Sequence, residues 1–108
     1  MTNITFKFNR QKAIETILFF ANRVSEPTRL KVMKLIYLAD KTSLEKYGRF
    51  ISGDTYVAMK HGPVPSCSYD LVKSSQVDYA FKSDGNNVVP VRDYDVNEFS
   101  KSDVECLE

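Results

Sequence analysis

The sequence predicts an α+β fold: a mainly helical single domain with a central apolar helix and a short antiparallel β-hairpin. Three observations support this expectation. Two stretches in the first half repeat apolar residues at helical spacing. Two β-rich runs flank the turn sequence Asp84-Gly85-Asn86. The length of 108 residues, with 43% hydrophobic and 27% charged content, is ordinary for one globular domain that spans residues 1–108.

The first helix is predicted from Arg10 to Val24, with Asn9 as its N-cap. Phe19 falls on the opposite side of this helix from the broad apolar face, among charged residues. It is therefore either a second packing contact within the domain or an exposed aromatic anchor for a partner. The apolar face comprises Ala13, Ile14, Ile17, Leu18, Phe20, Ala21 and Val24, and the polar face comprises Lys12, Glu15, Asn22 and Arg23.

The central helix is predicted from about Thr28 to Tyr47, because Pro27 prevents an earlier start and Gly48 is suited to a C-cap. Leu35 and Leu38 add apolar area opposite the main apolar arc. A helix that is apolar on most sides is either central to the fold or covered by a partner. The main arc comprises Leu30, Met33, Ile36, Tyr37, Ala39, Leu44 and Tyr47.

Asp40 lies in the middle of this apolar arc, where a carboxylate needs partners because an unpaired buried charge is costly. Arg49 is the nearest basic candidate, and the backbone N–H groups of residues 62–66 are another. Three interpretations stay open: a buried polar contact that ties the helix to a loop, a functional carboxylate, or simple exposure.

The segment "AMKHGPVPSCSYDL" is predicted to be rigid, because Pro63 and Pro65 fix their own φ angles and restrict the residues before them. A short strand, "TYVAMK", precedes it, and a short helix follows from Pro65 or Ser66 to about Ser75. We expect residues 59–66 to form a loop that packs against the end of the central helix, with Asp40 as its polar partner.

The last third predicts a hairpin and a terminal helix. The stretch "VDYAFKSDGNNVVPV" contains the hairpin, and Pro90 makes its return strand an edge strand. Ser102 and Glu105 have the spacing of a capping box, which predicts that a helix begins close to Glu108. One helical turn is not stable alone, so either this turn docks on the domain or the sequence is cut short.

Enzymatic chemistry has a weak signal. Cys67 and His61 are the residue types of a cysteine hydrolase, and a helix N-terminus would lower the pKa of the Cys67 thiol. A proline-stiffened segment separates them, however, and no known nucleophile signature surrounds Cys67. One histidine and two distant cysteines cannot form a closed zinc site, and there is no glycine-rich phosphate loop. We therefore expect no cofactor, no metal and no enzyme, with the cysteine hydrolase as the alternative.

Nucleic-acid and membrane partners are also disfavoured. The net charge is only +1, and no apolar run approaches the ~18 residues that span a bilayer. The first two helices resemble a helix-turn-helix in spacing, but the second is too apolar to lie in a DNA groove. DNA binding remains a third hypothesis. Two cysteines without disulfide-type spacing fit a reduced cytoplasmic compartment.

Protein binding is the function that the residues favour. A rigid loop with nearby aromatic and thioether side chains offers contact area at low entropic cost. Asp40 and Arg49 are expected to be structural polar residues. The predicted partner-binding residues are Phe19, Tyr56, Met59, His61, Gly62, Pro63, Val64, Pro65 and Tyr69.

The stretch from Lys34 to Leu71 resembles the signature of the Panacea domain, the family of SocA-like antitoxins and of phage-associated GepA-like proteins. The pattern begins with L-x-Y-x-A-D on a helix, followed by Y-G-R, G-D-x-Y-x-A-M, G-P-V-P-S and Y-D. These motifs correspond to Leu35, Tyr37, Ala39 and Asp40; Tyr47 to Arg49; Gly53, Asp54, Tyr56, Ala58 and Met59; Gly62 to Ser66; and Tyr69 and Asp70.

The resemblance implies a bacterial or prophage antitoxin that binds and blocks a protein toxin encoded beside it, without enzymatic activity. One member of the family instead delivers its toxin to the ClpXP protease, which is an alternative mechanism here. The sequence differs from the family pattern at two points. Family domains usually continue beyond the helix that "SDVECLE" begins, so a C-terminal part is expected to be missing. His61 stands where an aromatic residue is common before G-P.

Overall fold

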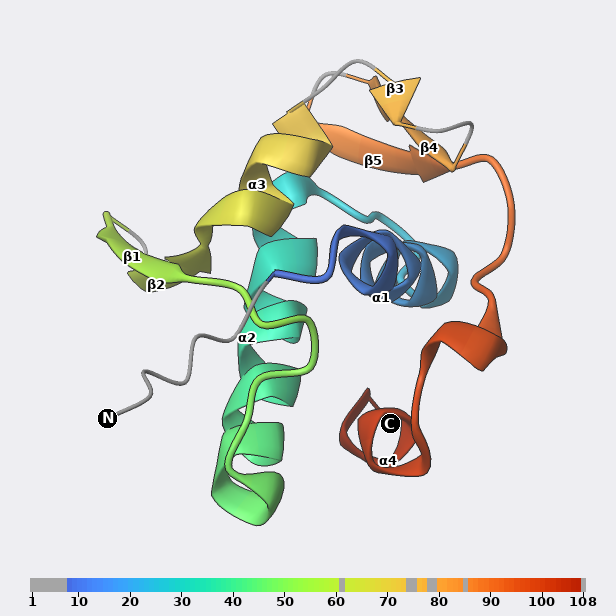
Figure 1. Cartoon of the computed structure of the whole chain (residues 1–108). Coiled ribbons are helices and arrows are strands. Elements are labelled where there is room, and N and C mark those ends of the chain that lie inside the picture. Colours follow the sequence, from blue (N-terminus) through green and yellow to red (C-terminus); the bar gives the residue numbers. More distant parts are fainter. Residues whose placement is uncertain (1–7, 61, 74–75, 78–79, 85, 108) are drawn as a thin grey trace.

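The computed structural model describes residues 8–60, 62–73, 76–77, 80–84 and 86–107. These residues form four α-helices, one 3₁₀ turn and two small antiparallel sheets, which confirms the mainly helical α+β fold (Figure 1). The elements are α1 (Arg10–Arg23), α2 (Arg29–Tyr47), β1 (Tyr56–Met59), β2 (Gly62–Pro65), α3 (Ser66–Lys73), β3 (Gln76–Val77), β4 (Phe81–Asp84), β5 (Asn87–Pro90), η1 (Val96–Glu98) and α4 (Lys101–Leu107).

Helix α1 is more deeply buried than its sequence predicts. Asn9 caps it by accepting a hydrogen bond from the Lys12 N–H, as expected. Every residue from Ala13 to Ala21 is buried, because α2, α3, β5 and η1 all contact α1. The expected polar face is therefore wrong at Glu15, which is fully buried.

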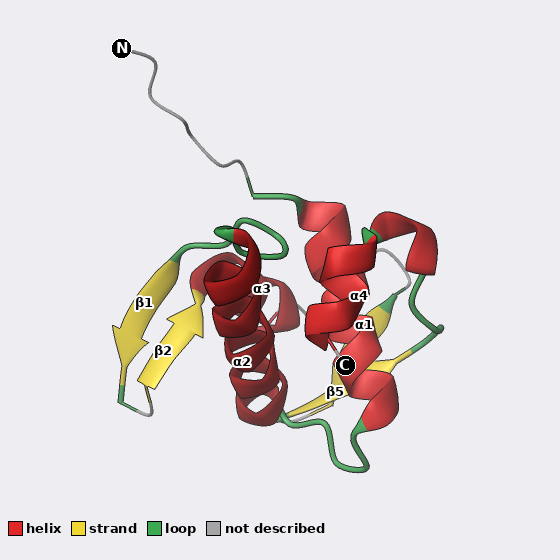
Figure 2. Cartoon of the chain, turned by 90° about the horizontal axis from the view of Figure 1, so that it is seen from below, coloured by secondary structure: helices red, strands yellow, loops and turns green. Residues whose placement is uncertain are grey.

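Helix α2 contacts α1, α3, α4 and β2, in agreement with its predicted central position. Thr28 caps its start, and Gly48 ends it in the left-handed conformation at φ 73°. Viewed from below, α2 separates the β1–β2 hairpin from α1 and α4 (Figure 2). Only part of its apolar surface is covered, since Leu30, Leu38 and Leu44 remain about half exposed.

The segment Gly62–Pro65, expected to be a loop, is a strand that pairs with β1. The Ser66 N–H donates to the Thr55 carbonyl at 2.8 Å, so Thr55 and Ser66 form a hydrogen-bonded pair at the end of the β1–β2 ladder. Bonded pairs alternate with non-bonded pairs along antiparallel strands. Pro63 and Pro65 therefore occupy the non-bonded positions, where the missing N–H costs nothing.

The predicted hairpin is present as β4 and β5, with Asp84 paired to Asn87. Gly85 lies outside the described residues. Strand β3 adds a third strand that the sequence pattern did not reveal, and β5 with Pro90 is an edge strand as expected. The hairpin is joined to the start of α2, because the Arg29 N–H donates to the Asn86 carbonyl at 2.7 Å.

Helix α4 begins at Lys101, which is two residues earlier than an N-cap at Ser102 would place its start. The Asp103 N–H donates to the Ser100 hydroxyl, and the Ser100 N–H donates to the Asp103 carboxylate, so Ser100 and Asp103 form the box instead of Ser102 and Glu105. Cys106 and Leu107 are buried in the hydrophobic core. The short helix therefore docks on the domain.

Candidate functional site

Asp40 is buried and hydrogen-bonded, and its partners differ from the two that its sequence position suggested. Its carboxylate accepts hydrogen bonds from the Ile51 N–H at 2.8 Å and the Tyr56 hydroxyl at 2.5 Å. Neither Arg49 nor the backbone of residues 62–66, the two expected partners, makes these bonds. Burial raises the pKa of Asp40, and the two hydrogen bonds only partly oppose this. Asp40 thus joins α2 to the chain leading into β1.

Asp54 performs the role that the sequence interpretation gave to Asp40. Its buried carboxylate accepts hydrogen bonds from the N–H groups of Cys67 and Ser68 at 2.9 and 2.8 Å, and from the Ser68 hydroxyl at 2.7 Å. A carboxylate on the free N–H groups of a first helical turn is stabilising. Asp54 therefore fixes the start of α3 to the chain segment that leads into β1.

Arg49, which was predicted to be a structural polar residue near Asp40, makes its contacts at α4 instead. Its guanidinium is 3.4 Å from the Asp103 carboxylate and donates to the Ser102 hydroxyl at 3.0 Å. Lys12 of α1 donates to the same carboxylate at 2.7 Å. Burial alone would raise the pKa of Asp103, but the hydrogen bonds from Lys12 and Ser100 outweigh it and lower the pKa.

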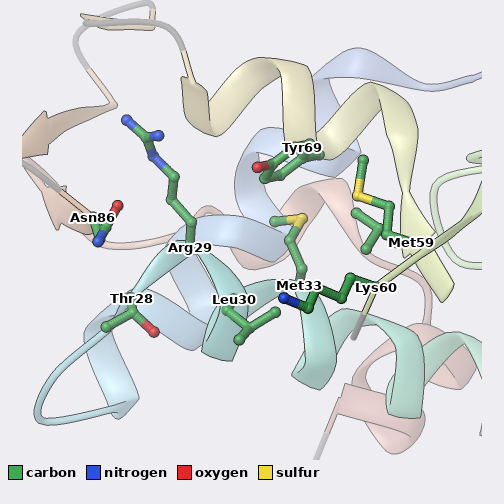
Figure 3. A pocket seen from close by; sticks show the side chains of 9 residues that line it. Thr28, Arg29, Leu30, Met33, Met59, Lys60, Tyr69 and Asn86 are labelled. Atoms are coloured by element: carbon green, nitrogen blue, oxygen red, sulfur yellow. The ribbon is translucent and has the colours of Figure 1, made fainter. Parts of the chain in front are cut away.

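A pocket of about 650 Å³ lies between α2, the β1–β2 hairpin and α3 (Figure 3). A second hollow of about 360 Å³ shares Leu30, Met33 and Val64 with it, so the two form one surface, which we call the α2 groove. The α2 groove is lined by Thr28, Arg29, Leu30, Met33, Lys34, Tyr37, Met59, Lys60, Pro63, Val64, Tyr69 and Asn86.

The floor of the α2 groove is apolar, and its exposed part carries both apolar and charged side chains. Met33 and Val64 are nearly buried, whereas Leu30 and Met59 are 50% and 45% exposed. Figure 3 shows Met33 rising from α2 toward Tyr69, with Met59 beside them and Arg29 at the other end near Asn86. Such a surface provides apolar contact area for a bound segment.

Four predicted partner-binding residues meet in the α2 groove: Met59, Pro63, Val64 and Tyr69. Gly62 and Pro65 belong to the same strand as two of them.

Two predicted residues have other surroundings, and one lies outside the described part. Tyr56 packs its ring on Tyr37 and Phe50 and gives its hydroxyl to Asp40, so its contacts here are structural. Phe19 is only 2% exposed and packs on Tyr94 at 5.0 Å, so the exposed-anchor interpretation is wrong. His61 lies outside the described residues.

The contribution of α2 to the groove was not predicted, because the apolar arc with Leu30, Met33 and Tyr37 left open whether the fold or a partner covers it. Leu30, Met33, Lys34 and Tyr37 have the i, i+3, i+4, i+7 spacing of one helix face, and that spacing was the available signal. The bordering cations Arg29 and Lys60 and the turn residue Asn86 carried no comparable signal.

A sequence model of the family described as "Antitoxin SocA-like, Panacea domain" matches residues 32–108. The chain belongs to this family. No curated protein and no solved structure matches it. In this Panacea domain, the family motif residues Asp40, Asp54 and Tyr56 connect α2, β1 and α3, and the proline-containing motif forms β2 beside the groove.

The surroundings of Cys67 in this Panacea domain disfavour the thiolate form. Burial raises its pKa, and the nearby Asp54 carboxylate raises it further. A raised pKa keeps the sulfur protonated and lowers its reactivity as a nucleophile. The expected lowering of this pKa by the helix N-terminus is therefore wrong.

The described residues of the Panacea domain contain neither a metal-binding cluster nor a membrane-spanning helix. No group of three or more histidine, cysteine, aspartate or glutamate side chains in this part could hold a metal ion. Likewise, no helix within it combines the length and the apolar character that a bilayer crossing requires.

Proposed function

We propose that this Panacea domain is a cytoplasmic antitoxin that neutralises a protein toxin by binding directly to it, and that the α2 groove is its contact surface. The observation that carries the proposal is the apolar groove itself, which is bordered by elements that the buried carboxylates of Asp40 and Asp54 join to their neighbours. A groove held by such contacts loses little conformational entropy on binding. Family membership supports the antitoxin role.

The proposal is tested with the protein encoded by the neighbouring reading frame. Producing that protein alone should stop growth, and co-producing this chain should restore it. The two purified proteins should then form a stable complex in size-exclusion chromatography. Growth rescue without any measurable complex would contradict direct neutralisation.

The same assay separates direct binding from protease delivery. An adaptor that hands its toxin to ClpXP protects only cells that contain this protease, and the toxin level falls when the chain is present. Direct neutralisation predicts full rescue in cells that lack ClpXP, with the amount of toxin unchanged. Immunoblotting of the toxin in both strains gives the answer.

Replacing Leu30 with serine should weaken toxin binding about tenfold or more, because a half-exposed leucine at an apolar interface is a contact that the toxin would desolvate. Leu44→Ser provides a matched control: Leu44 lies on the same helix, is 49% exposed, and is not among the groove residues. Titration calorimetry measures both variants. If Leu30→Ser and Leu44→Ser bind the toxin with equal affinity, the α2 groove is not part of the interface.

Cys67→Ala should leave neutralisation intact, because burial and the Asp54 carboxylate raise the pKa of its thiol and Cys67 is not among the residues that line the groove. Growth rescue and complex formation should match the unmodified chain. Complete loss of rescue by a variant that still folds and still binds the toxin would instead favour the cysteine hydrolase.

A further inference from the structure

The α2 groove has positive charge on its margin and no described negative charge. Arg29, Lys34 and Lys60 line the groove, whereas none of the described lining residues is acidic. None of the three cations takes part in an ion pair with the residues that the structure describes. The chain as a whole is nearly neutral, with 15 basic and 14 acidic residues, so this concentration is local.

The apolar floor indicates what kind of ligand these cations would accompany. Met33 and Met59 contribute flexible thioether side chains, and Tyr69 contributes a ring whose face is also approached by Lys73 at 4.8 Å. Thioethers adapt to irregular apolar side chains. A phosphate or a nucleic-acid backbone would bury none of this surface, but a protein segment with large apolar side chains would cover it.

We propose that the α2 groove binds an acidic amphipathic segment of the toxin, in which large apolar side chains are flanked by carboxylates. The proposal rests on the proposed antitoxin function and adds the chemistry of the partner. The apolar side chains would cover Leu30, Met33 and Val64, and the carboxylates would face Lys34 and Lys60. Opposite charges around an apolar contact fix the register of the segment and speed its association.

The first test uses the full chain and two synthetic peptides that share the same leucine positions. One peptide has glutamate at every polar position, and the other has lysine. Two of the three methionines line the groove, so ¹³C-labelled methionine methyl groups report binding by NMR. The glutamate peptide should shift the Met33 and Met59 signals and bind about tenfold or more tightly than the lysine peptide.

Charge reversal tests the role of the margin. The double variant Lys34→Glu/Lys60→Glu should reverse the preference between the two peptides and weaken toxin binding about tenfold or more. Lys41→Glu is the matched control, because Lys41 is an exposed lysine of the same helix outside the groove. Raising the salt from about 0.05 M to about 0.5 M should weaken toxin binding to the unmodified chain but affect the double variant less.

Several results would overturn the proposal. Equal affinity for the two peptides, or no methyl shift with either peptide, would show that the groove does not select an acidic segment. Methyl shifts of the same size with a DNA duplex would indicate a nucleic-acid ligand. Methyl shifts that grow with the concentration of the chain alone would indicate that a second copy of the chain occupies the groove. Toxin binding unaffected by the double variant would overturn this inference while leaving direct neutralisation in place. A toxin that does not bind the unmodified chain would refute the proposed function, and the peptides would still decide the chemistry of the groove.

Discussion

Replacing Asp54 with alanine should lower the free energy of unfolding by about 3–5 kcal/mol, because three donors of α3 lose a buried, charged acceptor. Helix α3 spans only eight residues, a length that is marginal without tertiary contacts. A domain of this size has a total stability of about 5–15 kcal/mol, so most of it would be lost. Chemical denaturation followed by circular dichroism measures the change.

Two variants distinguish a specific capping effect from a general loss of charge. Asp54→Asn keeps one acceptor oxygen and should lose about half as much stability as Asp54→Ala. Asp70→Ala removes an exposed aspartate of the same helix, whose contact with Lys73 is a surface ion pair, and should leave the unfolding midpoint nearly unchanged. If Asp54→Ala unfolds at the same denaturant concentration as Asp70→Ala, the cap does not stabilise α3.

The destabilisation should also reach the α2 groove. Tyr69 lies one helical position after the Ser68 that Asp54 holds, and it forms one wall of the groove. We therefore expect Asp54→Ala to weaken toxin binding even at temperatures where the variant is folded. This connects a buried motif residue to function without any contact between that residue and the toxin.

Local signals in the sequence were sufficient to place α1 and α2. Asn9, Thr28 and Gly48 mark helix ends through short-range hydrogen bonds or a left-handed backbone, so each is readable from its neighbours alone. The β4–β5 hairpin is similarly local. The predicted N-cap of α4 was wrong by two residues, because Ser100 and Ser102 both precede an acidic residue at the required spacing.

Long-range contacts were not readable from one sequence. Glu15 and Phe19 fall on the polar face of α1 by spacing, yet Arg92 and Tyr94 cover them from the other end of the chain. The same holds for the site. Its hairpin side could be predicted from rigidity and composition, whereas Leu30 on α2 is indistinguishable from a core leucine until α3 and β2 are placed.

The second large effect is expected at the pair of Glu15 and Arg92. Glu15 is fully buried and accepts two hydrogen bonds from the Arg92 guanidinium, at 2.9 and 2.7 Å, and a third from the Asp95 N–H at 2.7 Å. Arg92→Ala leaves this carboxylate buried and without its cation. Because the Arg92 side chain is 39% exposed and water can partly replace it, we expect a loss of about 3 kcal/mol, the low end for a broken buried pair.

A double variant and a surface pair provide the controls for this effect. Glu15→Gln/Arg92→Ala removes the uncompensated charge while it keeps an acceptor for the Asp95 N–H, so it should recover part of the lost stability. Lys46→Ala breaks an ion pair with Glu105 in which both side chains are half exposed, and the unfolding midpoint should hardly move. A single Arg92→Ala variant as stable as Lys46→Ala would show that the buried pair contributes nothing.

The pH dependence gives this prediction a second, independent readout. Burial alone would raise the pKa of Glu15, but the hydrogen bonds from Arg92 and the Asp95 N–H outweigh it and hold the pKa below its ordinary value. A lowered pKa contributes stability above the unfolded-state value of about 4.3, and this contribution is lost as the pH falls through the folded-state pKa.

In the Arg92→Ala variant, burial dominates and the pKa of Glu15 should rise. Protonation of Glu15 then removes the buried charge of the variant as the pH falls. The stability difference between the unmodified chain and Arg92→Ala should therefore be largest near neutral pH and shrink toward pH ~4 in denaturation experiments, whereas a difference that stays constant would mean that the ionised carboxylate is not its cause.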